Sequence, residues 1–151
     1  MPRGKLLDDT EMRKAIVKEL ENSSQIKVCR YSLLLAMHVL ELIKYPEIDY
    51  TTIIEGFFVN EQWQKGNART REVRQAGLKI HQMGNAYKDD ITRMALWAVG
   101  QAVAAGYRRE HAIVASDYAV NVINLLYPND MDAVKNERKW QLNHLQEIKD
   151  F

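Results

Sequence analysis

The chain has 151 residues, enough for one domain that buries about 70% of its unfolded surface. Lysine and arginine total 21 and aspartate and glutamate total 20, so the sequence lacks the basic excess of a nucleic-acid-binding domain. The lone cysteine, Cys29, excludes an internal disulfide, and no apolar run approaches the ~20 residues that span a bilayer. We therefore expect a single cytoplasmic domain over residues 1–151, with no signal peptide and no membrane partner.

The first predicted helix follows a start, residues 1–8, that we expect to be flexible. The helix begins at Asp8, Asp9 or Thr10, because Asp8 with Glu11 three positions later resembles a capping box. Its core-facing residues recur at helical spacing and are Met12, Ile16, Val17 and Leu20.

The second predicted helix runs from about residue 25 to residue 44. Asn22-Ser23-Ser24 precedes it and supplies its cap, and Tyr45-Pro46 ends it, because the residue before a proline avoids helical backbone angles. The residues expected to face inward are Ile26, Cys29, Leu33, Ala36, Leu40 and Ile43. The residues expected to face water are Lys27, Arg30, Glu41 and Lys44.

The third predicted helix is capped by Asp49 and ends near Trp63, before a left-handed stop at Gly66. Its apolar residues are Ile53, Ile54, Phe57 and Phe58. These positions predict a helix of about four turns with a largely apolar composition.

The fourth predicted helix runs from residue 68 to about residue 87, with Asn67 as its cap. Gly77 and Gly84 lie seven residues apart on its apolar face, where each costs about 1 kcal/mol relative to alanine. A reason to keep two such glycines is the close approach of another helix along that seam.

The most apolar stretch, residues 91–128, predicts two successive helices separated by Gly106. Small apolar residues occur on more than one side of the first of these helices, so we expect it to be surrounded by other helices. Pro128-Asn129-Asp130 then begins a last helix, whose apolar residues are Met131, Val134, Leu142, Leu145 and Ile148. No stretch alternates as a strand does, so the predicted fold is all-α, a single domain of about seven helices.

A weak internal repeat runs through this order. Residues 42–46 resemble residues 124–128, and Thr10-Glu-Met12 matches Thr92-Arg-Met94 at the same offset. The pattern suggests two pseudo-repeated three-helix units joined by the fourth helix. The alternative is that Tyr-Pro followed by an aspartate commonly ends one helix and begins the next, without any duplication.

The four histidines give no metal-ligand pattern. His38, His81, His111 and His144 lie on different predicted helices, whereas helical metal sites need ligands at i, i+3 or i+4. His38 and Glu41 are the nearest such pair, and we interpret them as a surface ion pair. The sequence predicts neither a metal site nor a cofactor.

Arg74-Gln75 followed by His81 matches the loose motif of HEPN ribonucleases, metal-free enzymes. In such a site the imidazole would handle a ribose hydroxyl proton and the guanidinium would hold the phosphate charge. Gly77 and the helices that follow fit that family poorly. We therefore interpret Arg74 and His81 as part of a solvated helix face, and we expect no enzymatic activity.

Asp117, Asn121 and Asn124 form a polar line at i, i+4 and i+7 on an otherwise apolar helix. We interpret this line as the solvent-facing stripe of an outer helix, the alternative being a polar line exposed in a groove. Trp63, Trp97 and Trp140 are expected first to fill spaces between helices.

The Glu137-Arg138-Lys-Trp140 stretch predicts a packing role in the last helix. Trp140 can lie on the central helices while Arg138 folds back to a carboxylate such as Asp117 or Glu110. We favour this intramolecular role over contact with a partner. His111, at a helix start, is expected to form a local hydrogen bond.

Several short stretches keep a fixed order between about residues 27 and 145. They are Leu33–Leu40, Trp63-Gln-Lys-Gly66, Glu72-Val-Arg74-Gln-Ala76, Ala95-Leu-Trp-Ala98, His111 with Tyr118-Ala119, and Glu137-Arg138-Lys-Trp140-Gln141 with Leu145. In this order and spacing they resemble the all-helical putative immunity protein family of bacterial polymorphic toxin systems. The first helix, residues 10–21, lies outside the resemblance.

This resemblance implies a small cytoplasmic protein that binds and neutralises a cognate protein toxin, without a catalytic residue or cofactor. The residues it marks as structural or partner-binding are Trp63, Arg74, His111, Tyr118, Arg138 and Trp140. The sequence alone fits a helical interaction or regulatory protein with no toxin partner equally well. A metal-free ribonuclease that uses Arg74 and His81 is the third interpretation.

Overall fold

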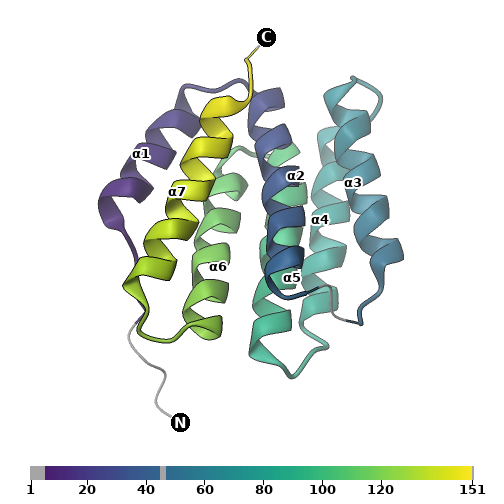
Figure 1. Ribbon diagram of the computed structural model, residues 1–151. Coiled ribbons are helices and arrows are strands. Elements are labelled where there is room, and N and C mark those ends of the chain that lie inside the picture. Colours follow the sequence, from purple (N-terminus) through teal and green to yellow (C-terminus); the bar gives the residue numbers. More distant parts are fainter. Residues whose placement is uncertain (1–5, 45–46, 151) are drawn as a thin grey trace.

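Seven α-helices and one short 3₁₀ turn make up the computed structural model over the described residues, 6–44 and 47–150 (Figure 1). In chain order they are α1 Thr10–Glu21, α2 Gln25–Leu42, α3 Tyr50–Gln64, α4 Thr70–Gly84, α5 Asp90–Val103, η1 Ala104–Gly106, α6 Glu110–Leu126 and α7 Met131–Glu147. No strand occurs in these two ranges, so the all-α prediction and the number of helices are confirmed.

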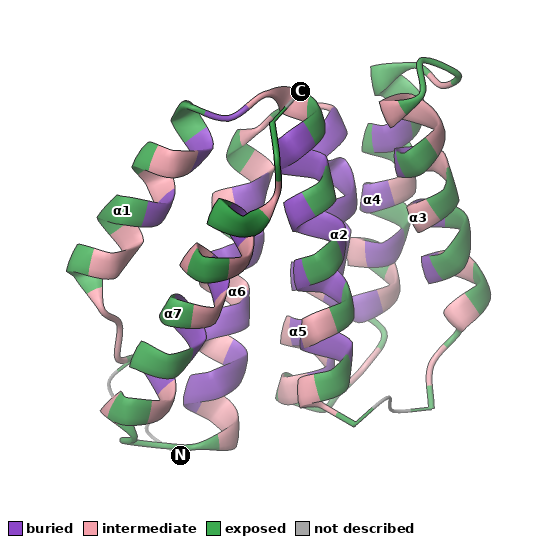
Figure 2. Cartoon of the chain, turned by 45° about the horizontal axis from the view of Figure 1, so that its top comes forward, coloured by how far each residue is buried: buried purple, intermediate pink, exposed green. Residues whose placement is uncertain are grey.

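The helices are arranged around α5 at the centre of a single domain. In Figure 1, α1 and α7 lie at one end, α3 and α4 at the other, and α2, α5 and α6 between them. α5 packs on α4, α6 and α2, and buried residues gather on these inner helices (Figure 2). The prediction that this helix is surrounded is confirmed.

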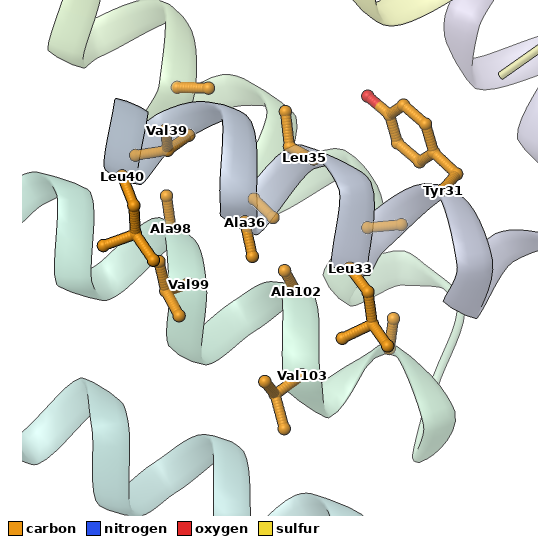
Figure 3. Close-up of a cluster of buried hydrophobic side chains, with 14 of the residues drawn as sticks. Tyr31, Leu33, Leu35, Ala36, Val39, Leu40, Ala98, Val99, Ala102 and Val103 are labelled. Atoms are coloured by element: carbon orange, nitrogen blue, oxygen red, sulfur yellow. The ribbon is translucent and has the colours of Figure 1, made fainter. Parts of the chain in front are cut away.

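Small side chains bring α2 and α5 together. Ala36 of α2 is fully buried, and it points toward α5, where Ala98 and Ala102 are also buried (Figure 3). Leu33 and Leu40 extend from the same face of α2 and fill the space on either side (Figure 3). Alanines on both helices shorten the distance between their axes, and the leucines then exclude water from the seam.

Two glycines bring α4 still closer to α5. A Cβ atom placed on Gly77 would lie 2.6 Å from the carbonyl oxygen of Gly100, and one placed on Gly100 would lie 2.8 Å from that of Gly77. A Cβ atom placed on Gly84 would likewise lie 3.1 Å from the Cβ atom of Leu96 on α5. The close approach predicted from Gly77 and Gly84 is confirmed.

Aspartates cap most of the helices, as their positions predict. Asp49, Asp89 and Asp130 each accept a backbone N–H bond in the first turn of α3, α5 and α7. For α1 the cap is Asp9, which accepts from the N–H of Met12, whereas Asp8 binds elsewhere.

The predicted cap of α4 is wrong. α4 begins at Thr70, after Arg69, and no side chain caps it. The backbone N–H of Asn67 instead bonds to the carbonyl of Gln62, in the turn where Gly66 has a φ of 81°. The left-handed stop at Gly66 is thereby confirmed, and the turn it makes delays the next helix by two residues.

At the start of α2, the predicted exposures of Ile26 and Lys27 are wrong. Ile26 is 40% exposed, whereas Lys27 is 8% exposed and places its Nζ 3.5 Å from Oε1 of Glu19 on α1. This ion pair, together with the burial of Val28, rotates the turn by one position. α2 ends at Leu42, and Tyr45-Pro46 lies outside the described residues.

On α3, only part of the predicted apolar face is buried. Ile53 is 2% exposed, but Ile54 and Phe58 are 64% and 60% exposed. The buried face contains Gly56 and Asn60 instead, and Asn60 Nδ2 donates to the carbonyl of Val103, 2.8 Å away. α3 therefore contacts the core through small and polar residues as well as through Ile53.

The predicted internal repeat pairs α1 with α5 and α2 with α6. α5 packs along α6, whereas α1 packs along α7 and makes its next contacts with α6 (Figure 1). The two triplets are therefore not packed alike, which counts against a duplication. Superposition of the two units is the direct test of this prediction.

Candidate functional site

A cleft of about 690 Å³ opens between α4, η1 and the start of α6. Its floor includes Gly77 and Gly100, because the close contact of α4 and α5 leaves no side chains there. Its polar and aromatic lining consists of Arg74, His81, Gln101, Tyr107, Arg108, Glu110 and His111. The glycine seam thus creates a hollow with a dense set of side chains able to bind a ligand.

Two arginines lie over one tyrosine at this cleft. The guanidinium carbons of Arg74 and Arg108 lie 5.5 and 5.3 Å from the centroid of the Tyr107 ring, within the range of a cation–π contact. Among the described residues, no carboxylate forms an ion pair with either arginine. Their charges are held in place by an aromatic ring and are not neutralised.

His111 is oriented by α5. Its Nδ1 lies 2.6 Å from Oε1 of Gln101, so Nδ1 carries the proton and neutral His111 keeps Nε2 as an acceptor. Burial lowers the pKa of His111, and the charges of Arg108 and Arg74 lower it further, while Glu110 opposes them. His111 thus forms a hydrogen bond, as predicted, but to a residue ten positions earlier on α5 and not to a local partner.

His81 lies on the other side of the cleft, at the end of a row of rings. Its ring stacks on Trp97 with centroids 5.3 Å apart, and Trp97 lies 6.0 Å from the ring of Tyr118. Burial lowers the pKa of His81, and its Nδ1 has no hydrogen-bond partner among the residues that the structure describes. Arg74 and His81, two helical turns apart, do line one cleft.

A second cluster of polar residues surrounds Arg138 on α7. Arg138 is fully buried and donates to both oxygens of Asp8, at 2.8 and 2.9 Å. It also donates to Asp117 on α6, 2.7 Å away, and Arg13 on α1 donates to the two oxygens of the same carboxylate. The predicted contact between Arg138 and Asp117 is present, and Asp8 and Arg13 extend it.

The cluster continues along α7 to α2. Gln141 accepts from Arg138 and donates to Glu137, and the other oxygen of Glu137 lies 2.7 Å from Nε2 of His38. Trp140 lies between two imidazoles, with centroids 3.7 Å from His38 and 3.9 Å from His144. His38 is only 15% exposed, so its predicted place on the wet side of α2 is wrong.

The polar line on α6 is not a solvent stripe. Asn124 is 8% exposed and binds the backbone of Leu7 through both a donated and an accepted hydrogen bond, and Asp117 is held by two arginines. Asn124 thus binds the segment that leads into α1, and Asp117 binds α1 and α7 through Arg13 and Arg138. Leu7 and Asp8, at the end of the start predicted to be flexible (residues 1–8), are thus hydrogen-bonded, and residues 1–5 lie outside the described part.

The sequence match decides the family. The model of the family described as Imm-5 like putative immunity protein matches residues 18–148. The chain belongs to this family. The match includes the last turn of α1, so it extends the predicted family region, 27–145, at both ends. No curated protein and no solved structure matches the chain.

In this member of the family, the six residues marked by the resemblance fall into separate groups. Arg74 and His111 line the cleft, and Tyr118 lies behind it against Trp97. The α7 cluster contains Arg138 and Trp140, while Trp63 is half-buried beside Gly106. The structure therefore brings together some of these residues and separates the rest.

Tyr107, Arg108 and Gln101 also line the cleft and were not predicted from the sequence. Arg108 and His111 are three positions apart at a helix start, a spacing that places them on one side, and this was the available signal. Gln101 carried no such signal, because only the packing of α5 on α6 brings it to His111.

Two further properties concern the described residues. None of their helices is long and apolar enough to cross a membrane. Nor do they contain a group of three or more histidine, cysteine, aspartate or glutamate side chains able to hold a metal ion.

Proposed function

We propose that this chain is an immunity protein that binds a cognate protein toxin and neutralises it by covering a surface the toxin needs. The observation that carries the proposal is the family match over residues 18–148. We expect the protein to act in the cytoplasm and without catalysis. It then needs only a stable surface that is complementary to the toxin.

The closely packed helices support a binding role. The core elements α2, α4, α5 and α6 are fixed by alanine and glycine contacts that leave little room for rearrangement. A preorganised surface loses little conformational entropy on binding, which favours tight association.

Co-expression tests this function directly. The genes that neighbour this one are first searched for a toxin module, and a module found there is expressed in a sensitive host, alone and together with the chain. We expect growth to be restored and the two proteins to co-elute as one complex. Continued growth arrest together with independent elution would reject the proposal.

A metal-free ribonuclease is the second candidate, favoured by the shared position of Arg74 and His81 at one cleft. Incubation of the purified chain with RNA in the presence of a chelator tests it. RNA cleavage that is lost in His81→Asn, with an unchanged melting temperature, would support this activity over simple binding.

A further inference from the structure

The cleft between α4 and α6 has an excess of positive charge. Arg74 and Arg108 project from its two sides and contact Tyr107, while the lining supplies one carboxylate, Glu110. His81 and His111 add no fixed charge at neutral pH, because burial lowers the pKa of both. An arginine without a carboxylate partner is a ready site for an acidic group.

An apolar rim lies beside these charges. Leu78 on α4 is 44% exposed and Val114 on α6 is 37% exposed, and both line the same cleft. Leu78 is one turn after Arg74 on α4, and Val114 lies in the second turn of α6, the helix that begins after Arg108. The hollow thus presents a charged end and an apolar end to a single ligand.

We propose that this cleft is the docking site for the toxin, and that it receives an acidic side chain of the toxin between Arg74 and Arg108. An adjacent apolar side chain of the toxin packs on Leu78 and Val114. This inference rests on the proposed function and adds to it the surface and the chemistry of contact. Arg74 and Arg108 then help to determine which toxin the protein binds.

The geometry favours a carboxylate over other groups. A guanidinium offers two parallel N–H donors that match the two oxygens of a carboxylate, and Tyr107 restrains both arginines before binding. Both arginines are exposed and so are accessible to a partner, and a bound toxin that covers the cleft would exclude water and strengthen each such ion pair. Arginine and tyrosine are also the residues that dominate binding energy at protein interfaces.

A protein ligand fits better than a nucleic acid. Glu110 at the cleft would repel successive phosphates, and the apolar rim of Leu78 and Val114 offers no contact to a sugar–phosphate backbone. The chain as a whole has a formal net charge of only +1. A protein segment with an acidic residue next to an apolar one matches both the two arginines and the apolar rim.

Charge reversal in the full chain tests the inference. The variant Arg74→Glu/Arg108→Glu is compared with Lys135→Glu/Lys139→Glu, which makes the same change in net charge at exposed positions of α7. Affinity for the toxin module identified by the co-expression test is measured by titration calorimetry at low and high salt, with melting temperatures as the folding control. Arg74→Gln/Arg108→Gln provides a second pair that removes the charges without reversing them.

We expect the cleft variant to bind about 100-fold more weakly and to lose most of the salt dependence seen with the wild type. The α7 variant should bind as the wild type does, and Leu78→Ser should weaken binding about 10-fold. If the wild type binds the toxin and both arginine variants bind equally well, the inference is overturned while the proposed function stands.

The remaining outcomes also decide the question. If the wild type binds no toxin, the proposed function fails and the inference fails with it. A fluorescent RNA oligonucleotide serves as the competing probe. RNA binding that needs Arg74 and Arg108, combined with toxin binding that does not, would assign the cleft to nucleic acid and overturn the inference.

Discussion

Arg138 donates to both carboxylate oxygens of Asp8, a residue 130 positions earlier in the chain. The pair joins the segment before α1 to α7, and Asp117 of α6 and Arg13 of α1 complete a row of alternating charges. Burial alone would lower the pKa of Arg138 and raise that of Asp8, but the bonds between them reverse both shifts. The row holds the two terminal helices together.

Replacement of Arg138 by alanine should therefore lower the stability of the whole domain. We expect a loss of about 3 kcal/mol in the free energy of unfolding, because the change leaves two carboxylates without their buried partner. Asp8 and Asp117 are 29% and 35% exposed and regain some hydration, so the loss stays near the lower end of the range for buried pairs. Urea unfolding measures it.

Lys139→Ala is the matched control for this prediction. Lys139 is the next residue along α7 and is exposed, so its removal should change the free energy of unfolding by less than about 0.5 kcal/mol. Equal stability of the wild type and Arg138→Ala would show that the row of charges has no net stabilising effect.

Of the two carboxylate partners of Arg138, Asp117 could be predicted from the sequence and Asp8 could not. Asp117 could be predicted as a partner because it lies on a helix that α7 has to follow closely. Asp8 matched a helix cap just as well, since an aspartate before a helix normally bonds to the first turn. Only the path of the chain places Asp8 beside α7, and hydrophobic periodicity carries no information about that path.

Gly77→Ala and Gly100→Ala should each destabilise the domain by about 2 kcal/mol. The new Cβ would meet a backbone carbonyl oxygen of the facing helix at 2.6 or 2.8 Å, so α4 and α5 have to move apart. This penalty exceeds the gain of about 1 kcal/mol in helix propensity. Thermal melting of the two variants measures the net effect.

Gly56→Ala is the control, because the nearest atom to its new Cβ is the flexible end of Ile80, 2.7 Å away. A small rotation of that side chain relieves the contact, so the helix-propensity gain should keep the melting temperature close to that of the wild type. An equal loss in Gly56→Ala would contradict the explanation by backbone contact.

The cleft was predictable only in part, for a related reason. Arg74 and His81 share a face of one helix, and the helical period alone reveals that. Tyr107, Arg108 and Gln101 join them only through tertiary packing, that of α5 on α4 at the glycine seam and that of α6 on α5. Gly77 and Gly84 predicted a close helix–helix contact on α4, but the sequence did not indicate which helix packs there.

The single cysteine should be inert in the folded protein. Cys29 is fully buried, and burial raises the pKa of its thiol to about 12, while a hydrogen bond with Asn60 opposes the shift. Since the thiolate is the reactive form, we expect no reaction with a disulfide reagent at pH 8 and complete reaction in denaturant. Rapid labelling without denaturant would mean that α2 opens easily.

Mild acid should weaken the fold through the cleft histidines. Burial is the main cause that lowers the pKa of His81 and His111 below 6.5. Between that lowered pKa and 6.5, the unfolded chain binds more protons than the folded one, so stability falls as the pH falls. His81→Gln removes one of these groups, and its free energy of unfolding should decline less steeply between about pH 7.5 and pH 5. Urea unfolding across this range compares the slopes, since other titrating groups are common to both proteins. Parallel slopes would show that His81 takes up its proton equally well in the folded and unfolded states.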